Sequence, residues 1–212
     1  ELVEGSGVNS KIFNLKNVNR SDISKIKLKY KIKKNEKVIL MVGRLIVSKG
    51  IIDLLKASKE NKLKVKFIII APKEKNYFFK ESINQSIINK YKNNKLVLID
   101  KYINDIRPFL SISDLVIYPS NYREGIPRFL IEALAFSKPI LTKKNPGCKE
   151  TVIEYQNGLF IKNYKDINKK IEYIFKNNKR YKSYCKKSFE IFNLRFKSSL
   201  VINKMILLYE KS

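Results

Sequence analysis

The chain has 212 residues, 45 lysines and arginines against 19 aspartates and glutamates, and no histidine, so its formal net charge is +26. The lack of histidine excludes Ser-His and Cys-His nucleophile pairs, a histidine general base, and zinc or iron sites that use histidine. With 44% hydrophobic residues the chain can bury a core of ordinary size, and its length suits one domain or two small ones.

The positive charge is concentrated in residues 11–37 and 162–212. A field of this sign attracts polyanions, and the two candidate partners are nucleic acid and an anionic membrane leaflet. A lysine-rich surface is also typical of the amino-acid usage of an AT-rich genome. No apolar run reaches the roughly 18 residues of a membrane span.

The first predicted element is ambiguous in type. Lysines alternate with apolar residues over Lys25–Lys33, which favours an edge strand. Ser21 as an N-cap, with Asp22 in the first turn, favours a helix instead. We expect the helix.

Further along the chain, short β-branched apolar runs alternate with longer amphipathic stretches. The apolar runs predict six buried parallel strands, at residues 38–42, 65–70, 96–99, 115–118, 139–142 and 158–161. The other stretches predict helices at residues 50–60, 77–92, 104–113, 127–136 and 147–154, and a helical region from residue 165 to the end. This succession indicates an α/β fold, a Rossmann-like doubly wound parallel sheet of about six strands with long C-terminal helices.

In such sheets ligands bind at the carboxyl ends of the strands, where loops meet helix N-termini. Gly43 and Arg44 follow the first predicted strand, and Lys49 and Gly50 precede the next helix. A guanidinium fork and an ammonium group beside a helix start form a candidate phosphate site. The alternative is two exposed cations on a loop. Neither a Walker loop nor a GxGxxG fingerprint is present, so ATPase and NAD-binding functions lose their main support.

Two glutamates follow the fourth predicted strand. Pro127 suits the first helical position, which leaves Glu124 on the loop and puts Glu132 in the second turn of a helix that is apolar on nearly every side. Such a carboxylate needs a partner, either a vicinal diol or a structural salt bridge. A glycosidase pair is disfavoured, because the nearby cations hold carboxylates ionised whereas a glycosidase acid needs a raised pKa.

The two glutamates, after a strand ending in Tyr118-Pro119-Ser120, resemble the E-x7-E signature of retaining glycosyltransferases of the GT-B fold, in particular family 4. The resemblance covers almost the whole chain. Its further pieces, in order, are Gly5–Asn9, Gly43-Arg44-Leu45, Lys49-Gly50, Asp105-Ile106-Arg107, Pro146–Glu150 and Asn157-Gly158-Leu159. The form Arg123–Arg128 with Pro146-Gly147-Cys148 is most similar to the branch that builds bacterial surface polysaccharides and lipid-linked oligosaccharides.

The resemblance implies roles for the residues at the strand exits. Arg44 and Lys49, beside Gly43, would hold the donor diphosphate, and together with Glu124 they would be the catalytic residues. The lack of histidine and of a DxD motif agrees with a metal-independent mechanism without a cofactor.

The same resemblance places the rest of the donor. Glu132 would bind the ribose hydroxyls, and Tyr102 and Ile103 would flank the nucleobase. The backbone amides of Gly125 and Ile126 would help to hold the transferred sugar. The donor would be a UDP-sugar.

The resemblance also implies a domain organisation. Residues 1–212 would be a single donor-binding domain, the C-terminal half of an enzyme whose N-terminal acceptor domain is absent from this chain. Residues 196–212 would form a helix that crosses back toward that domain, and the fragment alone is expected to be inactive. The acceptor would be a glycan or a polyprenyl-linked molecule. We expect a cytoplasmic protein, peripheral at the inner face of the plasma membrane.

A second class of function is a non-catalytic, basic nucleotide- or nucleic-acid-binding domain. Binding of nucleic acid calls for aromatic side chains on a sheet face or for a basic recognition helix. The 12 tyrosines and 12 phenylalanines show no such grouping. We therefore expect nucleic acid not to be a partner.

Overall fold

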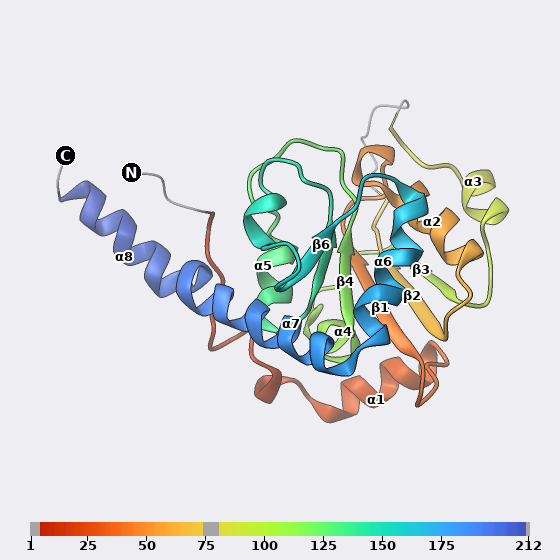
Figure 1. Ribbon diagram of the computed structural model, residues 1–212, viewed down its shortest axis with the longest axis horizontal. Coiled ribbons are helices and arrows are strands. Elements are labelled where there is room, and N and C mark those ends of the chain that lie inside the picture. The colour runs from red at the N-terminus through yellow and green to blue at the C-terminus, as the bar shows by residue number, and fades with distance from the viewer. Residues whose placement is uncertain (1–4, 74–80, 211–212) are drawn as a thin grey trace.

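The computed structural model describes residues 5–73 and 81–210, which form a parallel sheet with helices on both faces (Figure 1). The sheet in these residues has six strands in the order β3-β2-β1-β4-β5-β6. The strands are β1 Lys37–Val42, β2 Val65–Ile70, β3 Leu96–Ile99, β4 Leu115–Tyr118, β5 Ile140–Thr142 and β6 Gly158–Phe160. The predicted α/β class and all six predicted strands are confirmed, each end within one residue.

The central strands are buried on both faces. β1 pairs with β2 in register from Lys37 opposite Val65 to Val42 opposite Ile70, and β2 and β4 are buried along their whole length. A parallel sheet covered by helices on both sides favours apolar runs over alternation, and these strands have such runs, which in β2 only Lys66 interrupts.

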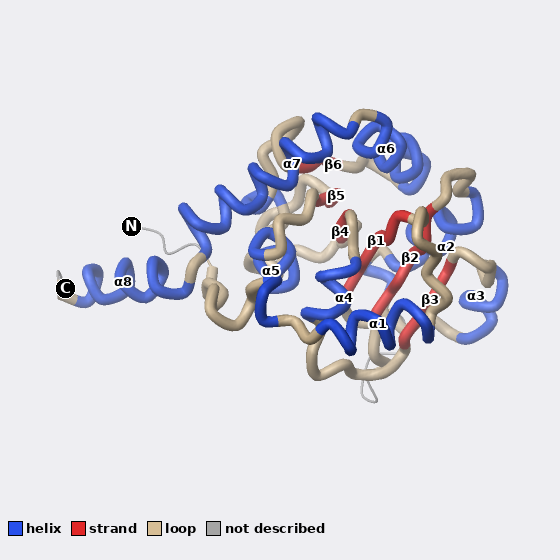
Figure 2. The backbone as a smooth tube through the Cα atoms, turned by 90° about the horizontal axis from the view of Figure 1, so that it is seen from below, coloured by secondary structure: helices blue, strands red, loops and turns tan. Residues whose placement is uncertain are grey.

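Helices cover both faces of the sheet. The α-helices of the described residues are α1 Arg20–Lys29, α2 Ile51–Glu60, α3 Gln85–Lys90, α4 Arg107–Ile112, α5 Arg128–Ala135, α6 Tyr164–Lys176, α7 Asn178–Ile191 and α8 Ser198–Tyr209. Figure 2 shows α1, α4 and α5 on one side of the sheet and α2, α3 and α6 on the other. α1 packs on α4, and α2 packs on α6.

The ambiguous N-terminal element is the helix α1, as expected, but the predicted cap was wrong. Asn19, not Ser21, is the N-cap, and its side-chain oxygen accepts from the Ser21 N–H at 2.9 Å. Asp22 lies in the first turn, as predicted. α5 also begins one residue later than predicted, because Pro127 is in an extended conformation and serves as the N-cap.

Three predicted helices are shorter than expected. The helix predicted at residues 104–113 is α4, which begins only at Arg107, because the Asp105 side chain accepts from the Arg107 N–H just before the helix starts. The helix predicted at residues 147–154 is only a 3₁₀ turn, Lys149–Thr151, because the side chain of Asn157 bonds the backbone at Thr151 and Ile153 and holds the chain in a loop. The helix predicted at 77–92 is α3, which starts after its N-cap Asn84. Residues 77–80 of that prediction lie outside the described residues.

The predicted C-terminal helical region is divided into α6, α7, a π-helical turn at Phe192–Phe196, and α8. The N-terminal segment is tied to the start of α8, because the Val8 N–H donates to the Phe196 carbonyl at 2.8 Å and the Ser198 N–H donates to the Val8 carbonyl at 3.0 Å. Beyond this point α8 extends away from the body (Figure 1).

α8 exposes much of its apolar surface, for example at Ile202, Ile206 and Leu207. Val201 on the same helix is buried, because it packs against Gly7 at the junction of the N-terminal segment with α8. Within the described ranges, no helix has both the length and the apolar character that a bilayer crossing requires.

Candidate functional site

The exits of β1 and β4 meet at the centre of the sheet, where the strand order reverses. The loop after β4 is held against the 3₁₀ turn Val47–Lys49 that follows β1, because the Asn121 N–H donates to the Ser48 carbonyl at 2.7 Å. Gly50 permits this approach. Its φ is +75°, and a Cβ there would lie 2.3 Å from the Pro119 carbonyl oxygen. The topological switch point is thus where two of the predicted site loops come together.

Lys49 and Glu124 form an ion pair at this junction. Lys49 is buried, with only 3% of its surface exposed, and its Nζ lies 4.9 Å from the centre of the Tyr122 ring and 5.4 Å from that of Tyr118. The Tyr118 hydroxyl donates to Glu124 Oε1 at 3.0 Å. Burial and the Glu124 charge both raise the pKa of Tyr118, which keeps it a hydrogen-bond donor. The alternative of an exposed loop cation is therefore wrong for Lys49.

The loop that carries Glu124 is fixed from the β5 side. Gly147 has φ +78°, and a Cβ there would lie 2.3 Å from the Gly125 carbonyl oxygen and 2.5 Å from that of Glu124. The Asn145 side-chain amide donates to the Ser120 carbonyl at 2.7 Å. The loop after β5 therefore positions the backbone on either side of the carboxylate.

Five of the other predicted site residues line an open cleft of about 650 Å³ beside this cluster. Predicted residues that line it are Gly43, Arg44, Tyr102, Ile103 and Glu132. Tyr102 is 76% exposed. A cleft of this size can accommodate a nucleotide.

Glu132 has the partner that its burial requires. The carboxylate is 7% exposed and accepts from Arg128 Nε at 3.0 Å, one helical turn away. Burial raises the pKa of Glu132, and the Arg128 guanidinium opposes that rise. Arg128 and Glu132 both line the cleft, and the Arg128 side chain is largely exposed there.

Arg44 connects the cleft with the buried cluster. It lines the cleft, and its guanidinium carbon lies 5.8 Å from the centre of the Tyr122 ring, which Lys49 also approaches. The structure therefore brings the two predicted phosphate-binding cations to one aromatic ring. Gly125 and Ile126 follow Glu124 on the loop and do not line the cleft.

Several residues that contribute to the site were not predicted from the sequence. Arg107 forms an ion pair with Asp105 at 2.8 Å and donates to the Ile12 carbonyl at 3.3 Å, which ties the N-terminal segment to the cleft. This pairing lowers the pKa of Asp105. Asp105 and Arg107 both belong to the motif Asp105-Ile106-Arg107, which could have pointed to them. The four-residue spacing of Arg128 and Glu132 likewise predicts a helical ion pair. No sequence signal pointed to Tyr122.

Comparison with known proteins shows which family the chain belongs to. Residues 22–190 match the family described as Glycosyl transferases group 1. CapM of Staphylococcus aureus, a capsular polysaccharide biosynthesis glycosyltransferase, is 29% identical over 157 residues, which are 71% of this chain and 40% of CapM. The N,N'-diacetylbacillosaminyl-diphospho-undecaprenol alpha-1,3-N-acetylgalactosaminyltransferase of Campylobacter jejuni is 24% identical over 176 residues, 82% of this chain and 44% of the relative.

A solved structure shares the fold. HepE of Anabaena, in complex with UDP and glucose, superposes with a TM-score of 0.81 at 19% identity, over 97% of this chain and 56% of that one. The chain thus spans less than half the length of the two relatives above and about half that of HepE. Because the family match runs from α1 into α7, the resemblance predicted from the sequence is confirmed, and the chain belongs to the glycosyl transferases group 1 family.

Proposed function

We propose that this chain is the donor-binding part of a retaining glycosyltransferase that takes a sugar from a UDP-linked donor. The observation that carries the proposal is that Arg44, which lines the cleft together with Glu132, and the buried Lys49 beside the cleft approach the same Tyr122 ring. Cations placed for a diphosphate, with a carboxylate nearby for a ribose diol, are the complement of a nucleoside diphosphate. Family membership and the UDP bound to HepE support the same ligand.

The proposal gives each part of the donor a place in or beside the cleft. Arg44 and Lys49 hold the diphosphate, Glu132 accepts hydrogen bonds from the ribose hydroxyls, and the base lies beside Tyr102 and Ile103. Lys49 is already paired with Glu124, so a diphosphate oxygen at Lys49 would lie close to the carboxylate that we assign to the transferred sugar.

We propose the following course for the transfer. The bond between the sugar C1 and the diphosphate oxygen breaks, and a bond forms between C1 and the acceptor hydroxyl oxygen on the same face. The acceptor proton passes to the departing phosphate oxygen. Arg44 and Lys49 offset the charge that grows on the leaving diphosphate, without a metal ion. Glu124 and the backbone amides of Gly125 and Ile126 orient the sugar.

The acceptor side of the reaction lies outside these residues. We propose that an N-terminal domain supplies it, and that residues 196–212 pack on that domain through the exposed apolar side chains of α8. The acceptor is a glycan or a polyprenyl-linked molecule in bacterial surface-polysaccharide synthesis, as the names of the two relatives suggest. Such a reaction belongs at the cytoplasmic face of the plasma membrane.

Calorimetry with UDP, ADP and GDP tests the proposal. We expect UDP to bind, and Arg44→Ala to weaken it. A single-stranded oligonucleotide that binds with a steep salt dependence and is not displaced by UDP would instead indicate a basic nucleic-acid-binding domain.

A further inference from the structure

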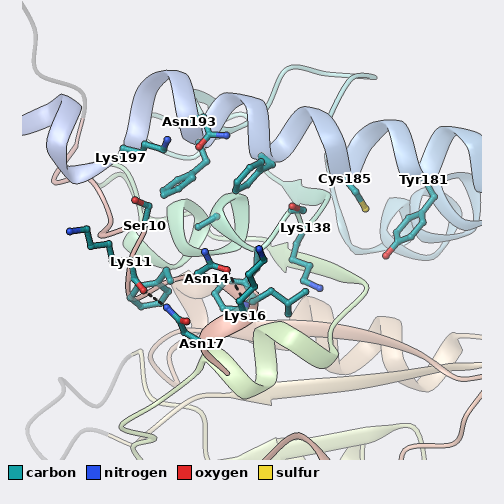
Figure 3. Close-up of a pocket in the computed structure, with 17 residues that line it drawn as sticks. Ser10, Lys11, Asn14, Lys16, Asn17, Lys138, Tyr181, Cys185, Asn193 and Lys197 are labelled. Atoms are coloured by element: carbon teal, nitrogen blue, oxygen red, sulfur yellow. Dashed lines mark hydrogen bonds between the residues drawn. The ribbon is translucent and has the colours of Figure 1, made fainter. Parts of the chain in front are cut away.

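A groove of about 860 Å³ lies next to the donor cleft and is distinct from it. Figure 3 shows α7 and the segment of residues 10–17 facing each other across it, with Lys138 between them. Phe13 lines both the groove and the donor cleft. Most of the groove surface is apolar, and its larger apolar side chains are Phe13, Leu15, Phe136, Phe189 and Phe192.

The charge of the groove is of one sign. Four lysines line it and no acidic residue does; the lysines are Lys11, Lys16, Lys138 and Lys197. In the donor cleft, by contrast, Arg107 pairs with Asp105 and Arg128 pairs with Glu132. Lys11, Lys16 and Lys197 form no ion pair with any described residue. The groove therefore presents positive charge that the described part of the protein does not neutralise.

A neighbouring hollow extends the positive surface. It shares Lys138 and Tyr181 with the groove and adds four lysines, Lys27, Lys33, Lys34 and Lys37, against Glu36 and Asp114. The two hollows together form a continuous lysine-rich surface along α1, α7 and the segment before β1.

Apolar side chains on the two walls of the groove face solvent. Leu15, on the N-terminal segment, is 59% exposed, and Phe189, on α7, is 43% exposed. Exposed apolar side chains in a groove that is also lined by lysines match a lipid surface, where they reach the acyl boundary while the ammonium groups stay at the phosphates. A soluble polyanion would satisfy the lysines and leave Leu15 in water.

We propose that this groove and the lysines that line it dock the chain on a membrane of anionic phospholipid. Leu15 and Phe189 enter the headgroup region, and Lys11, Lys16 and Lys197 lie at the lipid phosphates. The proposal goes beyond the transfer reaction and does not depend on it, because the groove holds none of the residues assigned to the donor.

The chain has no tryptophan, which allows a clean test. Leu15→Trp should shift its emission to the blue with vesicles of phosphatidylcholine containing about a third phosphatidylglycerol, and not with phosphatidylcholine alone. Ile153→Trp is the control, since Ile153 is exposed and lines neither hollow. A shift at both positions, or at neither, would overturn the assigned docking face.

A charge comparison separates a docking site from net charge. The triple variant Lys11→Glu, Lys16→Glu, Lys197→Glu should bind anionic vesicles at least tenfold more weakly in sedimentation. The control Lys62→Glu, Lys64→Glu, Lys92→Glu changes the charge equally outside both hollows and should bind like the parent. Equal weakening in the two variants, or binding of an oligonucleotide in place of vesicles, would refute the proposal. UDP affinity, measured in parallel, reports on the donor site separately.

Discussion

The Lys49 ammonium and the Glu124 carboxylate form an ion pair that joins the turn after β1 to the loop after β4. Only 4% of the Lys49 side chain and 25% of the Glu124 side chain are exposed, so each charge depends on the other. Removing one partner of such a pair leaves the second without compensation. The pair therefore fixes the relative position of the proposed diphosphate and sugar subsites.

Replacing the proposed phosphate ligands should weaken UDP binding. Loss of one charge-assisted contact costs about 1.5–3 kcal/mol, so Arg44→Ala and Lys49→Ala should each lower the affinity roughly ten- to a hundredfold in calorimetry. Arg44→Ala is the cleaner variant, because Lys49→Ala also leaves Glu124 unpaired. Lys101→Ala, an exposed cation beside Tyr102, should bind like the parent. Unchanged UDP affinity in both Arg44→Ala and Lys49→Ala would show that the diphosphate does not bind at these residues.

The two glutamates should have separable roles. Glu132 lines the cleft, so Glu132→Gln should weaken binding of UDP itself by about 1.5 kcal/mol. Glu124 lies on the loop outside the cleft, so Glu124→Gln should leave UDP affinity nearly intact and reduce transfer by the full-length enzyme. Titrations of both variants with UDP decide the matter, and equal losses would contradict the division.

UDP-sugar affinity should depend on pH through Glu132. Burial raises the pKa of this carboxyl above its ordinary value of 4.5. The ionised form accepts the ribose hydrogen bonds, so affinity should be full near neutral pH and fall as the pH drops through the raised pKa. UDP-glucose is the suitable probe, because its diphosphate is a diester that does not titrate in this range. Glu132→Gln should have a flat profile, and a parent profile equally flat would count against the ribose contact.

Much of the fold could be predicted because each buried strand of a parallel sheet appears in the sequence as a short apolar run. The apolar runs at β1 and β4 are buried on both faces, and their short length and β-branched residues favour a strand over a buried helix. The 3₁₀ turn at Lys149–Thr151 could not be predicted in the same way. Its backbone is held by Asn157, and a side chain bonding back to an earlier loop has no periodic signature.

The residues of the candidate site could be predicted from the sequence, whereas the contacts between them could be predicted only in part. Strand exits and helix starts point to Arg44, Lys49 and Glu132, because their positions depend on neighbouring elements of the chain. The Lys49–Glu124 pair joins residues 75 positions apart, and the ring of Tyr122 between Arg44 and Lys49 depends on how two loops fold against each other. Such contacts follow from tertiary packing alone.

Gly147 should be essential for the position of the Glu124 loop. Its positive φ and the 2.3 Å approach of the Gly125 carbonyl leave no space for a Cβ, so Gly147→Ala should lower the free energy of unfolding by about 1–3 kcal/mol. Gly125→Ala is the matched control, since nothing lies within 4 Å of its Cβ position and its φ is not positive. Denaturant unfolding of both variants measures the difference. Equal stability would mean that the two loops can separate without cost.

Residues 1–212 alone should bind a UDP-sugar without transferring it. The chain spans less than half the length of its two relatives, and the residues that we assign to catalysis contact the donor only. The proposed N-terminal domain would also cover the apolar surface of α8, where Ile202, Ile206 and Leu207 are each about half exposed on one extended helix. Apolar surface of this kind drives association, so the chain should self-associate in analytical ultracentrifugation, and Ile206→Ser with Leu207→Ser should reduce that association. Transfer by residues 1–212 at a rate comparable with the full-length protein would refute the proposed division between donor and acceptor domains.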